Sequence, residues 1–376
     1  MNDIVFANLF FFLSLGFILG IGFAFYFHFW FLLNFLASLI FYLKFKNLKF
    51  SLLFLLFLFL GSFYYFLREE INLPQVQVPS LIKHYRSFLE EKIKSSLSFP
   101  EENLLRGIFL GSKFDDKEIK DDFINSGLIH LTAVSGQNLT IMFSIFYEAL
   151  KYLSFLTPNL IFYFSSFLIV FFVFLMGFEG NVLRAGIMGF LLILTKRKFG
   201  RIPLKRNILI FALLLFSLFS PKLIFKDIGT QLSFLAIAGI FYLSPIFEKK
   251  IEFIKNNFFR KTISETLSAQ IFTYPLILYY FGNFNFFSLI SNLLVLPIVP
   301  YLMTISSLFL FFPIKYLAWL SFPLLTYILF IAKIFGNFVF YFKIPLILVI
   351  LSYFLIFLEI YYQTKNETID FRFNLS

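Results

Sequence analysis

Cysteine is absent from this chain, histidine is rare and charged residues are few. The absence of cysteine excludes disulfide bonds and thiolate metal sites. The three histidines, His28, His84 and His130, show no paired spacing, so we expect no transition-metal site and no cofactor. Charged residues make up 14% of the chain, well below their share in soluble domains. An ordinary soluble domain is therefore excluded.

Apolar residues dominate the composition of the chain. Hydrophobic residues make up 60% of the 376 residues, and the mean hydropathy is +0.86. This composition predicts an all-α, polytopic membrane protein with about ten to twelve transmembrane helices, some of them short or broken. No cleavable signal opens the chain, so we expect the first apolar run to be retained as an anchor. The expected spans are 4–22, 23–43, 50–67, 127–151, 160–177, 181–195, 207–219, 228–247, 262–281, 286–312, 317–337 and 344–362.

The net charge of +11 resides in short loops between the apolar runs. Residues 44–49, 196–206 and 248–261 together hold the whole excess of positive charge. A basic protein can bind nucleic acid through its surface, but this distribution is the one that the positive-inside rule describes. We therefore expect these three loops and both chain termini to be cytoplasmic.

Residues 68–126 form a sizeable polar segment in which start signals predict helices. Helices are expected after Pro79-Ser80, near Pro100-Glu101 and after a cap at Asp115 or Asp116. They would lie on the membrane surface or pack over the mouth of the helix bundle. The expected organisation is 1–67 for N-terminal transmembrane helices, 68–126 for an extracytoplasmic amphipathic helical segment, 127–362 for the transmembrane core and 363–376 for a cytoplasmic tail.

A polar stripe marks residues 127–151, which are otherwise long and apolar enough to cross a bilayer. Ser135-Gly136 supplies an expected break in this helix. Polar groups at membrane depth are tolerated where they face protein or a water-filled cavity. The stripe fits an inward-facing helix of any polytopic protein, or a helix that lines a path for a polar substrate. On a helix its members share one side: Gln137, Thr140, Ser144 and Glu148, with His130 nearby.

Further polar groups recur in the later spans. Arg184 lies inside an apolar run, where a lone arginine is costly and needs a partner or a function. We expect it to pair with Glu148; the alternative is that both side chains snorkel to opposite interfaces. At the start of another span lie Asp227 and Gln231, and Asp227 can also serve simply as a helix N-cap. The polar faces continue with Gln270 and Asn292.

These residues do not predict an enzyme. Ser135 and His130 are five residues apart, which places them about 140° from each other around a continuous helix. Ser135-Gly136 also lacks the preceding glycine of a nucleophile elbow. We therefore expect no catalytic residues.

Three ordered motifs resemble a known family. The run His130-Leu-Thr-Ala-Val-Ser-Gly-Gln-Asn138 resembles the signature of ComEC-type competence proteins. Arg184-Ala-Gly-Ile-Met188 is similar to the next motif of that family, and Asp227-Ile-Gly-Thr-Gln-Leu-Ser-Phe-Leu-Ala236 to the one after. The resemblance covers roughly residues 80–310, with weaker matches at Gln270-Ile-Phe-Thr-Tyr-Pro275 and Asn292-Leu-Leu-Val-Leu-Pro297.

The resemblance implies a channel that imports single-stranded DNA across the bacterial inner membrane during natural transformation. It implies as partners single-stranded DNA, the lipid bilayer, a separate DNA receptor, a cytosolic translocase and a nuclease. Relatives carry an OB-fold domain and often a metallo-β-lactamase-like domain. Because residues 68–126 predict helices and no histidine-rich motif follows, we expect only the transmembrane core here.

A polyanion crossing a membrane needs hydrogen-bond donors along a wet path and few fixed positive charges, which would hold phosphates too tightly. We therefore expect Gln137, Asn138 and Arg184 to line the path or to contact phosphate. The further candidates are His130, Asp227, Gln231, Thr140, Ser144, Gln270 and Asn292. Two alternatives remain open: a transporter of another anionic or lipid-linked solute, and a structural subunit of an uptake complex. The oligomeric state is not defined by the sequence.

Overall fold

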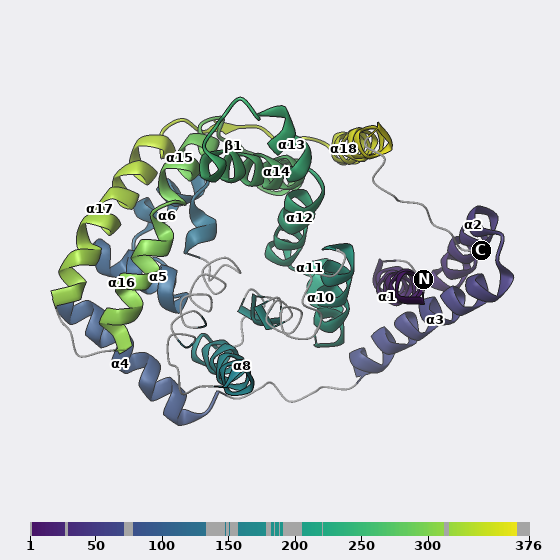
Figure 1. The fold of residues 1–376 in the computed structure, drawn as a ribbon, viewed down its shortest axis with the longest axis horizontal. Coiled ribbons are helices and arrows are strands. Elements are labelled where there is room, and N and C mark those ends of the chain that lie inside the picture. The colour runs from purple at the N-terminus through teal and green to yellow at the C-terminus, as the bar shows by residue number, and fades with distance from the viewer. Residues whose placement is uncertain are drawn as a thin grey trace. The chain divides into compact units, whose positions relative to one another are not determined.

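A computed structural model describes residues 2–26, 29–70, 78–132, 147, 150, 157–177, 182–183, 185–187, 189–190, 205–219, 221–311 and 316–366. The chain divides into two compact units (Figure 1). The first comprises Met1–Val76, Leu194–Phe234 and Asp370–Ser376. The second comprises Gln77–Ile193 and Leu235–Ile369.

The first unit is built on a pair of closely packed apolar helices. Its helices are α1 (Asn2–Tyr26), α2 (Trp30–Phe45), α3 (Leu48–Glu70), α10 (Lys205–Phe219), α11 (Pro221–Lys226) and the start of α12 (Ile228–Tyr242). Glycines bring α1 and α3 together, because a Cβ at Gly61 would lie only 1.9 Å from the carbonyl oxygen of Phe17. Buried rings of Phe12, Phe41 and Phe54 fill the space beside α2.

The second unit holds the remaining elements. Its helices are α4 (Ser80–Ser96), α5 (Glu101–Leu110), α6 (Lys117–Asn125), η1 (Ile129–Leu131), α8 (Pro158–Leu175), α13 (Ser244–Lys250), α14 (Asn257–Tyr280), α15 (Ser288–Val295), α16 (Val299–Phe311), α17 (Tyr316–Gly336) and α18 (Leu346–Asn366). Two short strands, β1 (Asn283–Phe284) and β2 (Phe340–Tyr341), pair antiparallel with Asn283 opposite Tyr341. This pair ties the end of α14 to the segment that follows α17.

Several described helices suit a bilayer, where helices satisfy their own backbone polar groups. Two pairs of consecutive helices are together long and apolar enough to cross a bilayer, but each pair is bent. The bend is 45° between α12 and α13 and 46° between α15 and α16, where Pro297 cannot donate a backbone hydrogen bond. These features confirm a polytopic, all-α membrane protein with short and broken helices. The four long apolar stretches are Asn8–Tyr26, Leu48–Leu67, Tyr316–Gly336 and Leu346–Gln363, and three shorter ones are Trp30–Phe45, Asn159–Leu175 and Asn207–Leu218.

The expected number of ten to twelve spans stays a prediction. The expected spans 127–151 and 181–195 lie largely outside the described residues. Where a comparison can be made, boundaries differ by a few residues. The first turn, for example, is expected after residue 22, whereas α1 continues to Tyr26 and α2 begins at Trp30.

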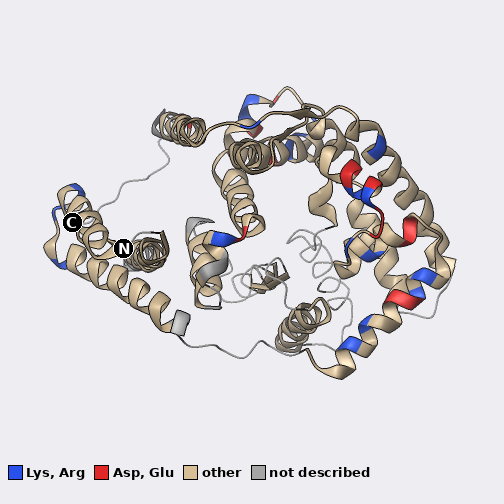
Figure 2. Cartoon of the chain, turned by 180° about the vertical axis from the view of Figure 1, so that it is seen from behind, with Lys and Arg blue, Asp and Glu red and all other residues tan. Residues whose placement is uncertain are grey.

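Helices occupy the polar segment near the expected starts. Helix α4 begins directly after Pro79, and Asp116 caps α6 by accepting hydrogen bonds from the backbone N–H groups of Glu118 and Ile119. Charged residues gather on α4–α6 and near the α13–α14 connection (Figure 2). Helix α5 is nevertheless buried almost throughout, in a core shared with α4, α8, α16 and α17. The segment thus packs on apolar helices instead of standing apart from them.

Cations of α4 satisfy carbonyl groups at the C-terminal ends of two apolar helices. Arg86 donates to the carbonyl oxygen of Leu175 in the last turn of α8, at 3.3 Å. Lys92 donates to the carbonyl oxygen of Leu310 near the end of α16, at 3.1 Å. Cations at helix C-termini are favourable because they meet the negative end of the helix dipole. Burial lowers the pKa of Lys92.

Candidate functional site

Buried and half-buried polar side chains gather where α14, β1 and α15 meet the start of the 127–151 stretch. We call this cluster the polar junction; it consists of Gln270, Tyr274, Asn285, Ser288, Ser291, Asn292 and the segment 125–130. Asn285, only 4% exposed, donates both amide hydrogens, to the carbonyl oxygens of Asn125 and Phe335, each at 2.7 Å. Its own oxygen accepts the backbone N–H of Phe287 at 2.7 Å. One amide therefore joins segments that are distant in sequence.

Ser288 lies at the centre of the polar junction. Its hydroxyl accepts a hydrogen bond from Gln270 Nε2 at 3.1 Å and also contacts the hydroxyl of Tyr274. Gly127 approaches so closely that a Cβ there would lie 2.8 Å from the Cβ of Ser288, and its φ of +77° also favours glycine. Ser291 donates to the carbonyl oxygen of Ser126 at 2.7 Å. The start of the polar stretch is thus held against α15.

Three predicted site residues meet in the polar junction. His130 Nδ1 lies 3.0 Å from the carbonyl oxygen of Gly127, Asn292 Nδ2 donates to the carbonyl oxygen of Ser288 at 2.7 Å, and Gln270 reaches the Ser288 hydroxyl. These contacts are all with groups of the protein itself. The residues therefore position the chain around Gly127, and their role toward a substrate stays a prediction.

Asp227 and Gln231 lie in the first unit, at the start of α12. The carboxylate of Asp227 accepts from the backbone N–H of Thr230 at 2.8 Å and from its hydroxyl. Gln231 Nε2 donates to the carbonyl oxygen of Phe225 at 2.8 Å. Asp227 is thus a helix cap, as the simpler interpretation expected.

Most of the polar stripe lies outside the described residues. The remaining predicted residues lie outside the described residues, and so does the predicted pair of Glu148 and Arg184. The proposed roles in the path and the proposed helix break stay predictions for Gln137, Asn138, Thr140, Ser144, Ser135 and Gly136.

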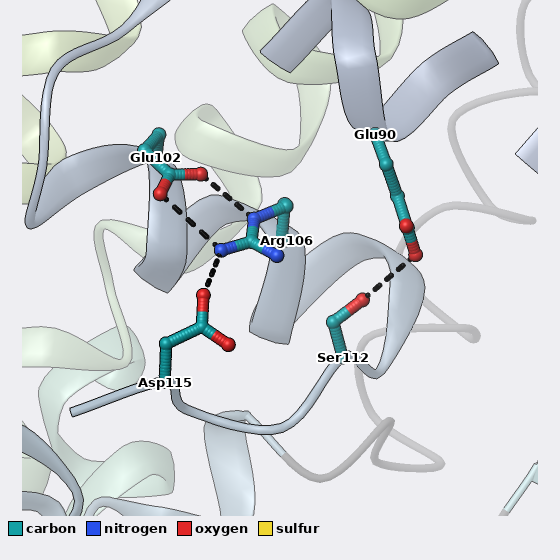
Figure 3. A network of polar contacts seen from close by, with 5 residues as sticks. All are labelled: Glu90, Glu102, Arg106, Ser112 and Asp115. Atoms are coloured by element: carbon teal, nitrogen blue, oxygen red, sulfur yellow. Dashed lines mark hydrogen bonds and ion pairs between the residues drawn. The ribbon is translucent and has the colours of Figure 1, made fainter. Parts of the chain in front are cut away.

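A second polar cluster surrounds Arg106 on α5 (Figure 3). The Arg106 side chain is 7% exposed; its guanidinium binds Glu102 through Nε at 2.7 Å and through a second nitrogen at 3.2 Å, and it also binds Asp115. Beside it, the hydroxyl of Ser112 donates to Glu90 at 3.1 Å. Burial alone would lower the pKa of Arg106, but the hydrogen bonds and charges of Glu102 and Asp115 raise it. The cluster holds a fully charged arginine inside the second unit.

Comparison with known proteins identifies the family. Residues 108–366, well over half of the chain, match the model of the Competence family, described as competence protein. The chain belongs to this family. It is also 27% identical over 227 residues to the ComE operon protein 3 of Bacillus subtilis (strain 168), an alignment that covers 59% of this chain and 27% of that protein. The chain therefore aligns with about a quarter of that relative's length. No solved structure gives a significant match.

The Competence match begins within α5 and includes every residue of the polar junction. Sequence reasoning named Gln270, Asn292 and His130 but did not select Asn285, Tyr274 and Ser291 as site residues. Helical periodicity placed Asn285 on one polar face with Ser288 and Asn292, but it gave no sign of the contacts that Asn285 makes with Asn125 and Phe335, which depend on tertiary packing. Arg106 was also missed, although a lone arginine inside the apolar run 104–110 was a usable signal.

Proposed function

We propose that this member of the Competence family conducts single-stranded DNA across the bacterial inner membrane during natural transformation. One observation carries the proposal: Ser126 and Gly127, which lead into the competence signature at His130, lie against the buried side chains of Ser291 and Ser288 on α15. Polar side chains at membrane depth are tolerated where they face protein or a water-filled cavity, and a fixed start would help to orient the polar stripe that follows.

The chemistry of the candidate residues supports an anion that moves on. Amides and hydroxyls donate hydrogen bonds to phosphate oxygens without reading base sequence. Dense lysine or arginine would add binding energy that slows release. The candidates carry many amides and one arginine, Arg184, so their composition favours passage over retention.

The partners follow from the same proposal. The chain would act without catalysis in the inner membrane, with both termini in the cytoplasm. A separate receptor would deliver the DNA, a nuclease would remove the second strand and a cytosolic translocase would draw the strand inward.

Transformation in a deletion strain tests the proposal. Complementation with the wild-type gene should restore it, whereas Gln137→Ala and Arg184→Ala should leave transformation at least about tenfold lower with membrane insertion unchanged, because each removes a donor from the path. Asn257→Ala, an exposed site at the start of α14, is the matched control. Normal transformation in both variants would remove these residues from the path. Normal transformation together with poor growth in the deletion strain would favour a carrier of another anionic solute.

A further inference from the structure

We propose that Arg106 is a phosphate-binding site on the route of the strand, and that Asp115 occupies it between passing phosphates. The inference rests on the proposed function and adds a residue to it. In the exchange, a phosphodiester oxygen takes the place of the Asp115 carboxylate on the guanidinium. No covalent bond changes.

The geometry identifies which carboxylate yields. Glu102 lies one helical turn before Arg106, makes two contacts with the guanidinium and is 13% exposed. Asp115 makes a single contact from the loop between α5 and α6, and its side chain is 63% exposed. A single contact from a carboxylate that is itself exposed to water is easier to break than two contacts from a carboxylate that is mostly buried. Glu102 therefore stays in place and Asp115 exchanges.

Helix α5 contacts the start of the competence signature one residue after Arg106. A Cβ on the following residue, Gly107, would lie 3.4 Å from the Cβ of Thr132, so α5 contacts the chain within the signature itself. Asn103 lies three residues before Arg106 and is therefore its neighbour on the helix. Within the described part of the chain its amide is 1% exposed and neither amide atom has a hydrogen-bond partner. A buried amide without partners is costly, and a phosphate held at Arg106 would offer it an acceptor.

A DNA strand that keeps moving needs phosphate contacts that are quickly replaced, and exchange with the Asp115 carboxylate would provide this. Arginine binds phosphate through a planar fork, and without a competitor it would retain the anion. Asp115 supplies that competitor, because its carboxylate accepts a hydrogen bond from a terminal nitrogen of the Arg106 guanidinium. Each phosphate therefore binds Arg106 only until Asp115 rebinds the guanidinium, so that binding is local and brief.

Oligonucleotide binding to the purified full chain in nanodiscs tests the inference. A labelled single-stranded oligothymidylate is titrated at several salt concentrations and followed by fluorescence anisotropy. Asp115→Asn should tighten binding by about fivefold, because a competing charge leaves the site. Asp121→Asn removes the same charge from an exposed position on α6 and should change affinity by no more than about twofold.

Arg106→Gln provides the second measurement. It should lower the slope of log affinity against log salt by about 0.7, the value for one phosphate contact on a single strand. Thermal unfolding of each variant separates this effect from a loss of fold. Equal effects of Asp115→Asn and Asp121→Asn, or an unchanged salt slope in folded Arg106→Gln, would overturn the inference while wild-type uptake still supports the channel. Absence of DNA binding by the wild-type chain, with normal transformation in a deletion strain, would overturn both.

Discussion

At the scale of single residues, Asn285 uses both donor hydrogens of its side-chain amide as well as its oxygen. It donates twice, to Asn125 and Phe335, and it accepts once, from Phe287. An amide has just these capacities, whereas a carboxylate has no hydrogen to donate. These hydrogen bonds therefore explain why an amide suits position 285.

Asn285→Asp should lower the free energy of unfolding by about 2–4 kcal/mol, because an ionised carboxylate would face two buried carbonyl oxygens. A protonated carboxyl can donate one hydrogen bond, so the loss should be smaller at pH 5 than at pH 8. Thermal unfolding in detergent at both pH values measures it. Asn257→Asp is the matched control, since Asn257 is exposed and already accepts from Arg260. Equal stability of the two variants would show that the amide of Asn285 is not required.

At the scale of helices, α1 and α3 approach through reciprocal glycines. A Cβ at Gly20 would lie 2.0 Å from the carbonyl oxygen of Leu58, and one at Gly61 would lie 1.9 Å from that of Phe17. Both contacts are with backbone, which cannot rotate away as a side chain can. Small residues allow this approach in membranes, where van der Waals contact drives helix association.

Gly61→Ala should therefore force α1 and α3 apart and destabilise the protein by about 1–3 kcal/mol. The change is measured as a lower unfolding temperature and lower abundance in the membrane. Gly107→Ala is the control, because its added Cβ would meet its nearest neighbour at 3.4 Å, an ordinary contact. Tolerance of Ala at both positions would mean that the two helices can separate without cost.

Local signals predicted elements better than they predicted contacts. Pro79 and Asp116 marked the starts of α4 and α6 because backbone restriction and capping act within a few residues. The burial of α5 and the binding of Arg106 to Asp115 depend on how separate helices pack, which hydropathy does not encode. The polar character of Gln270 and Asn292 was visible in sequence, but their meeting around Ser288 was not.

At the scale of the molecule, the direction of α17 bears on how many helices cross the bilayer. Within the second unit, Figure 1 shows α8 and α18 nearly end-on and α17 from the side. Transmembrane helices tilt by about 0–40° from the bilayer normal. Helices that run crosswise therefore cannot all span, although α17 is long and apolar enough to do so.

The neighbours of α17 are also unusual for a span. Thr326 donates to the buried carboxylate of Glu101 on α5, and Asp122 of α6 lies against Gly336 at the other end of the helix. Helices α5 and α6 of the polar segment thus pack along much of α17, while the side chains of Trp319 and Phe330 on α17 are exposed. We therefore expect α17 to lie at the outer interface of the membrane, with one apolar side toward lipid.

Single introduced cysteines can test this placement, because the chain has no cysteine of its own that would also be labelled. We expect Lys94→Cys and Asp121→Cys, at exposed positions on α4 and α6, to react equally with an impermeant maleimide in intact spheroplasts. Lys255→Cys, in an expected cytoplasmic loop, should react only after permeabilisation. Lys92, near Lys94, contacts the end of α16 that precedes α17, whereas Asp122, next to Asp121, contacts the far end of α17. Labelling of Lys94→Cys and Asp121→Cys from opposite sides would therefore mean that α17 crosses the bilayer and that α4–α6 cross beside it.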